Sequence, residues 1–255
     1  ISQVLSFAFV SVFLRLKSTK VRLTLGGYSF KIIGKTVKLG ISPFLITATD
    51  SAIIIVSNAV LQRYGGAEGD MWITVSTVVQ AFMSLITYPM LGISTGSQPV
   101  ISYNYGAKNF ALIKKAEKII LSMCLIFTTL MFCLSFVISE PFTALFTKDA
   151  QIIKESVRGI RVFMIGIIPL SFAYAFVDGL TALGQPQYAI SISFGRKLVV
   201  YLGSLLLLPA FFGVRAAFYA EPIADIVAAI VSTTIFLIAY PKIKRKRERA
   251  QGNLL

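Results

Sequence analysis

Residues 119–138 carry no charged side chain and read IILSMCLIFTTLMFCLSFVI. Twenty helical residues rise about 30 Å, which matches the hydrocarbon thickness of a bilayer. Comparable apolar runs recur along the chain, so we expect one partial and six complete membrane spans. The partial span is 1–14, and the complete spans are 39–61, 71–96, 119–138, 159–183, 187–212 and 214–240.

The composition supports a membrane protein. Of the 255 residues, 56% are hydrophobic and 14% are charged, and the mean hydropathy is +0.77. A soluble domain carries about 25% charged residues, which disfavours a soluble enzyme. The fold class that we expect is all-α integral membrane: a six-helix transmembrane bundle preceded by the end of another helix.

The motifs of an enzyme are missing from the sequence. There is no histidine for a Ser–His or Cys–His pair, no G-x-x-x-x-G-K-[ST] loop, and no zinc-type cysteine spacing. We therefore expect no catalysis and no cofactor beyond a coupling ion. Since direct use of ATP would need another subunit, an ion gradient is the simpler energy source.

The net charge of +14 predicts topology. Most bases fall in segment 15–38, in residues 108–118, at Arg196 and Lys197, and in the tail, which are all on one side of the predicted spans. Basic loops are retained in the cytoplasm. We therefore expect a multi-pass protein of the plasma membrane with a basic, partly amphipathic cytoplasmic linker at 15–38, a bundle at 39–240 and a cytoplasmic tail at 241–255. Nucleic acid is not expected as a partner.

The first residue is Ile1, and the bases of the linker follow the first apolar segment rather than precede it. A signal peptide has the opposite order. We expect the chain to be the C-terminal part of a longer protein.

Polar residues recur at spacings of three and four within three spans, as on one face of a helix. We expect these faces to surround a polar interior, although Ser and Thr also join membrane helices without any transport role. The faces comprise Thr47, Asp50, Ser57 and Asn58; Thr74, Thr77, Gln80, Ser84, Thr87, Ser94, Thr95 and Gln98; and Ser171, Tyr174, Asp178, Thr181 and Gln185.

Carboxylates inside spans are the strongest functional candidates, because each costs about 2.5–3.5 kcal/mol on insertion. Asp50 and Asp178 are expected to bind a coupling cation or a cationic substrate, and Asp50 could hold Na⁺ or a proton. A structural hydrogen-bonding role is the alternative for both. Asn58, Gln80 and Tyr174 are expected to line the same cavity.

A second set of residues suggests structural or gating roles. Glu221 and Asp225 lie one turn apart on either side of Pro222, and they are expected to pair with Arg196 or Arg215. Gln98 and Pro99 extend the polar face of span 71–96. These candidates are Gln98, Pro99, Arg196, Glu221, Pro222 and Asp225.

Three strings resemble the multidrug and toxic compound extrusion (MATE) family. Residues 92–109, GISTGSQPVISYNYGAKN, resemble the end of a lobe's second helix and the loop after it. The string ALGQP at 182–186, followed by Arg196, resembles the junction of helices ten and eleven. The string AEPIAD at 220–225 resembles a motif of helix twelve.

This resemblance implies helices seven to twelve of a two-lobe, twelve-helix transporter, with the end of helix six at 1–14 and the interlobe linker at 15–38. It also implies the export of cationic or amphipathic drugs in exchange for Na⁺ or H⁺, by alternating access between this lobe and a missing N-terminal lobe. Asp50 lies near a helix-seven Glu that binds cation in some members, whereas Asp178 does not fall cleanly on their helix-ten Asp.

Two other functions stay open at this point. A lipid-linked oligosaccharide flippase of the same superfamily would need basic residues in its cavity, and such residues are scarce within the spans. A non-transporting scaffold or receptor would show dry, well-packed polar faces instead of an ion-binding interior.

Overall fold

The computed structural model describes residues 2–14 and 29–252, and every regular element in this part of the chain is a helix. The all-α membrane prediction is confirmed. The elements are α1 (Ser2–Phe13), α2 (Phe30–Gly65), η1 (Gly66–Glu68), α3 (Gly69–Gly106), α4 (Phe110–Ala144), α5 (Ala150–Ala182), α6 (Pro186–Phe194), η2 (Gly195–Tyr201), α7 (Leu202–Phe212), η3 (Val214–Tyr219) and α8 (Ala220–Gly252).

Five stretches of the described chain are long and apolar enough to cross a membrane. They are Ala48–Gly106, Phe110–Ala144, Ala150–Ala182, Pro186–Phe212 and Val214–Arg245. The first stretch runs through the turn η1, so it contains most of the predicted span 39–61 and all of 71–96. The other four contain the remaining predicted spans to within a residue.

The described chain forms two compact units, residues 1–52 and 53–255, and each is considered by itself. The first unit holds α1 and the beginning of α2. Helix α1 has 12 residues, and its Phe7 and Phe9 side chains are exposed. Residues 15–28 of the predicted linker lie outside the described residues.

Helix α2 begins at Phe30, inside the predicted linker, and continues without a break to Gly65. Hydropathy placed the start of this span at residue 39, because Lys31, Lys35 and Lys38 lower the apolar average. Lysine is nevertheless a good helix former, so the helix extends beyond its apolar part.

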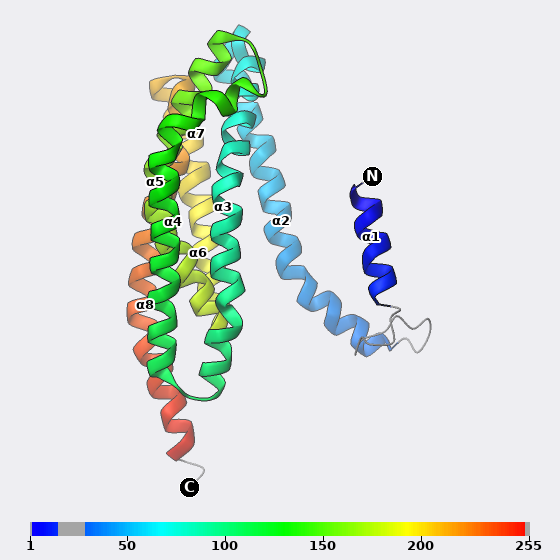
Figure 1. The fold of residues 1–255 in the computed structure, drawn as a ribbon, viewed down its shortest axis with the longest axis vertical. Helices are drawn as coiled ribbons and strands as arrows, with labels where there is room; N and C mark the ends of the chain where they lie inside the picture. Colours follow the sequence, from blue (N-terminus) through cyan, green and yellow to red (C-terminus); the bar gives the residue numbers. More distant parts are fainter. Residues whose placement is uncertain (1, 15–28, 253–255) are drawn as a thin grey trace. The chain divides into compact units, whose positions relative to one another are not determined.

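Helix α5 is the centre of the second unit and packs against α3, α4 and α8 (Figure 1). Its buried face meets large apolar side chains of its neighbours. The large apolar residues of α3, α4 and α5 that are less than 2% exposed include Phe82, Ile86, Met90, Ile113, Ile160, Met164, Ile167 and Leu180.

Small residues bring α8 close to α5. Ala220, Ala224, Ala228 and Ser232 follow one another at every fourth position and are at most 2% exposed. Across from them, a Cβ on Gly166 of α5 would lie 2.7 Å from the Cα of Pro222. Small residues of this kind allow membrane helices to approach closely, and packing contacts replace the hydrophobic effect as the source of stability.

Glycines end helices where the chain reverses. Gly66 and Gly184 have φ values of +55° and +73°, which favour glycine. Gly66 lies between the predicted spans 39–61 and 71–96, and Gly184 lies between 159–183 and 187–212. Pro89 and Pro99 lie inside α3 without ending it.

Candidate functional site

Asp178 of α5 is hydrogen-bonded to the polar face of α3. The Ser94 hydroxyl donates to Asp178 Oδ2, and the Gln98 amide Nε2 donates to Oδ1 at 3.0 Å. Ser94 is buried, and Asp178 is half-buried. Each carboxylate oxygen therefore has one donor, an arrangement that stabilises negative charge in the interior of the bundle.

Glu117 of α4 is a second carboxylate in the same region, and the sequence reasoning missed it. Its side chain is 5% exposed, and among the described residues neither carboxylate oxygen has a hydrogen-bond partner. It packs against Gly179, where a Cβ would collide with Glu117 Oε1. Because Gly179 follows Asp178 directly, the two carboxyl groups lie near each other, and they would repel if both were ionised.

The sequence does contain a signal for the burial of Glu117. Ile113, Ile120 and Cys124 lie four before, three after and seven after it, and all three are buried on α4. This spacing places Glu117 on the same helix face. The signal was hidden because exposed lysines at 114, 115 and 118 made the segment read as a cytoplasmic loop.

Arg196 joins the last two spans through an ion cluster with α8. Its Nε donates to Asp225 Oδ1 at 2.9 Å, and its Nη2 contacts Glu221 Oε1 and Asp225 Oδ1, both at 2.6 Å. The Asp225 side chain is fully buried, and that of Arg196 is 18% exposed. The predicted pairing of Glu221 and Asp225 with an arginine is thus resolved in favour of Arg196.

The backbone around Arg196 is a π-helical segment, η2, within an otherwise α-helical span. Such wide turns are rare and frequently occur at functional sites. The second oxygen of Asp225, Oδ2, has no hydrogen-bond partner among the described residues and faces Gly166 of α5. The cluster therefore lies where α5, η2 and α8 meet.

Arg215 has a different partner from the ones expected. Its Nη2 and Nε bind the two oxygens of Glu155 at 2.6 and 3.1 Å, which ties η3 to the beginning of α5. Its guanidinium also lies 5.8 Å from the ring centre of Trp72.

Tyr174 lies one turn before Asp178 on α5. It is half-buried and packs against the apolar core. Its role as a residue that lines the cavity stays a prediction.

The rest of the α3 polar face does not reach another helix. Thr74, Thr77 and Ser84 donate to backbone carbonyls four residues earlier, and Gln80 donates to Ser76 at 3.3 Å. Gln80 is exposed on the chain, as are Asn58 and Pro99. The polar face therefore divides into an end at Ser94 and Gln98 that contacts α5 and a remainder whose hydrogen bonds stay within α3.

Asp50 belongs to the first unit, whereas Asp178 belongs to the second. The Asp50 side chain is half-buried. Within the described residues, no group of three or more His, Cys, Asp or Glu side chains is close enough to hold a metal ion.

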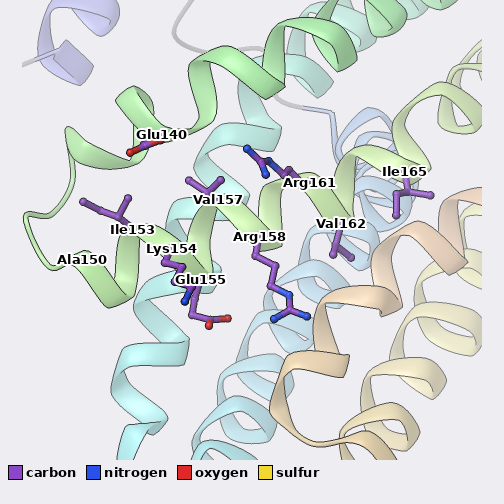
Figure 2. A pocket seen from close by; sticks show the side chains of 10 residues that line it. All are labelled: Glu140, Ala150, Ile153, Lys154, Glu155, Val157, Arg158, Arg161, Val162 and Ile165. Atoms are coloured by element: carbon purple, nitrogen blue, oxygen red, sulfur yellow. The ribbon is translucent and has the colours of Figure 1, made fainter.

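Two of the cavities among the described residues lie toward the ends of the bundle. One, of about 660 Å³, is lined by Glu140 of α4 and the first four turns of α5 (Figure 2). The other, of about 190 Å³, is lined by residues that include Tyr105, Gln185 and Lys242. Among the described residues, neither Asp178 nor Glu117 lines these two cavities.

Comparison with known proteins identifies the family. The MatE family model matches residues 44–206. The multidrug export protein MepA of Staphylococcus aureus is 24% identical over 237 residues, which are 92% of this chain and 51% of MepA. A FAD transporter of Shewanella oneidensis is 25% identical over 147 residues, 58% of this chain and 32% of that protein. The chain thus spans about half the length of the multidrug exporter that it matches.

Solved structures share the fold. An inward-facing multidrug resistance transporter of the MATE family superimposes with a TM-score of 0.83 at 19% identity, over 96% of this chain and 57% of that one. An outward-facing multidrug resistance transporter of the MATE family superimposes with a TM-score of 0.80 at 21% identity, over 96% of this chain and 55% of that one. The helical order, the matched strings and the family model agree, and the chain belongs to the MATE family of transporters.

Proposed function

We propose that this chain forms the C-terminal lobe of a secondary active antiporter, which exports cationic or amphipathic compounds in exchange for Na⁺ or H⁺. Its match to about half of MepA supports the idea that a second lobe completes the transporter. Alternating access would then arise as the two lobes rock about a central cavity.

The observation that carries this proposal is the pair of interior carboxylates, Asp178 and Glu117. Two negative charges in a poorly polarisable interior are costly unless a cation or a proton compensates them. Asp178 already has donors from Ser94 and Gln98, whereas Glu117 has none among the described residues. A bound cation, or a proton on Glu117, would remove this repulsion.

We propose that Asp178 attracts the positive group of the substrate, while Glu117 or Asp50 takes the coupling ion. The exposed polar residues Asn58 and Gln80 would line the wall of the cavity that faces the other lobe, together with Tyr174. Exposed polar groups along α3 suit a surface that borders a watery cavity better than one that faces lipid.

The Arg196 cluster has a structural role in this proposal. It holds η2 against α8, with Gly166 and Pro222 in close contact, so that the lobe moves as one body. Gln98 and Pro99 would connect the substrate site at Asp178 to the C-terminal end of α3. The basic loops and tail would face the cytoplasm, and the transporter would reside in the plasma membrane.

The flippase alternative is less consistent with the structure. A pyrophosphate group would need unpaired bases within the spans. Arg196, which lies inside a span, is neutralised by Glu221 and Asp225. The negative charge of the Asp178 region would repel such a substrate.

The experiment is efflux of a fluorescent cation from vesicles that contain the complete transporter, under an imposed Na⁺ gradient and then an imposed H⁺ gradient. We expect one of the two gradients to accelerate efflux. The absence of gradient-dependent movement across a broad panel of cations and amphipathic compounds would contradict the drug-export proposal.

A further inference from the structure

The cavity at the beginning of α5 has a charge pattern that the transport site does not use. Its lining includes Lys154, Arg158 and Arg161, which are all exposed (Figure 2). Their spacing of four and three residues places them on one face of α5. Cationic groups that gather on one side of a cavity favour an anionic ligand.

Two of these bases are available to bind a ligand. Within the part of the chain that the structure describes, Lys154 and Arg158 form no ion pair and no hydrogen bond. Arg161 lies over the ring of Phe136, with 5.9 Å between its Cζ and the ring centre. The bases therefore have donors left for a ligand.

The acidic residues of the lining only partly offset these charges. Glu155 is 7% exposed, and Arg215 binds both of its oxygens. Glu140 stands apart from the bases, at the end of α4 (Figure 2). The lining of the cavity therefore has an excess of positive charge.

The depth of the cavity decides the class of ligand. The apolar span on α5 is predicted to begin at residue 159, so Lys154 and Arg158 lie before it and Arg161 just within it. This is the level of lipid phosphates, beyond the hydrocarbon core. Val162 and Ile165 line the same cavity one to two turns further along α5, and Ile165 is 53% exposed.

We propose that this cavity binds an anionic glycerophospholipid. The phosphate contacts Lys154 and Arg158, and Arg161 can turn toward it from Phe136. An acyl chain lies along Val157, Val162 and Ile165. A cavity of about 660 Å³ holds the head of one such lipid and the beginning of its chains.

Long basic side chains near a membrane surface also contact lipid heads without selecting among them. The cavity predicts more than this, because its bases and its apolar wall lie in one depression. Binding is therefore expected to depend on both the headgroup charge and the acyl chain.

The test is lipid binding to the complete transporter in detergent, measured by native mass spectrometry with phosphatidylglycerol, phosphatidylcholine, and glycerol phosphate as the free headgroup. We expect phosphatidylglycerol to bind most tightly. The double substitution Lys154→Gln and Arg158→Gln is expected to weaken its binding about 25-fold, since each base near a lipid surface contributes a factor of about five.

The matched control is Lys148→Gln, which removes an exposed base of the preceding loop and is expected to leave binding unchanged. Val162→Phe fills the apolar part of the cavity and is expected to weaken phosphatidylglycerol binding but not the binding of glycerol phosphate. Equal binding of phosphatidylcholine, or wild-type binding by the double variant, would overturn the proposal. Binding of glycerol phosphate as tightly as the lipid would assign the site to free phosphate and overturn it too.

Discussion

Removing the charge of Arg196 should strongly destabilise the lobe. In Arg196→Gln, the carboxylates of Glu221 and Asp225 lose a cation that lies 2.6 Å from each. Asp225 is fully buried, and its Oδ2 already has no partner among the described residues. Breaking a buried ion pair by removing one partner costs about 3–5 kcal/mol, and we expect a loss in this range.

A second substitution separates the buried charge from lost packing. In the double variant Arg196→Gln with Asp225→Asn, the fully buried carboxylate is neutral. We expect it to recover at least half of the lost stability, because the main cost is the uncompensated charge rather than the missing contact. Lys154→Gln is the control, since it changes an exposed base without an ion pair in the described chain and should stay within about 0.5 kcal/mol.

The assay is equilibrium unfolding of the purified chain in mixed micelles with increasing sodium dodecyl sulfate, followed by circular dichroism. A loss of less than about 1 kcal/mol in Arg196→Gln would show that the ion cluster contributes little to stability and would contradict the prediction. A double variant that is less stable than Arg196→Gln would also refute it, because the buried charge would not be the dominant cost.

Three further outcomes follow from the packing of the interior. Gly179→Ala should cost about 1–3 kcal/mol by forcing a methyl group against Glu117, and this cost should shrink in a Glu117→Ala background, as unfolding in mixed micelles would measure. Glu117→Gln should not destabilise the chain, because the Glu117 oxygens accept no hydrogen bond among the described residues. The same substitution should change the ion dependence of transport. A large loss of stability in Glu117→Gln would contradict this prediction. The hydroxyls of Thr128 on α4 and Ser171 on α5 lie 2.9 Å apart. A double-mutant cycle of Thr128→Val and Ser171→Ala should give a coupling free energy of about 0.6 kcal/mol. A coupling of zero would show that this hydrogen bond does not contribute to stability.

Much of the fold could be predicted because membrane spans are local features. The length of the apolar runs placed the spans. The start of α2 could not be placed in this way, because hydropathy measures the apolar part of a helix and not its end. The π-helical turn at Arg196 was also missed, since no local residue pattern distinguishes it from an α-helical turn.

The candidate site was predictable in part. The polar faces of α3 and α5 were read from their spacing, and Asp178 does meet Ser94 and Gln98. Glu117 was missed because its neighbours in the sequence are lysines, whereas its neighbours in space lie on α5. Likewise, the sequence could not decide whether Arg196 or Arg215 meets Asp225, because that choice depends on the packing of distant helices.

The central claim is that Asp178 lies at the point where a cation binds in a MATE-type exporter. The most direct measurement is gradient-driven efflux of a fluorescent cation by the complete transporter carrying Asp178→Asn, beside the control Glu140→Gln, which changes an exposed carboxylate at the far end of α4. We predict that Asp178→Asn abolishes gradient-driven efflux while the control retains it. Wild-type efflux with unchanged ion dependence in Asp178→Asn would contradict the claim.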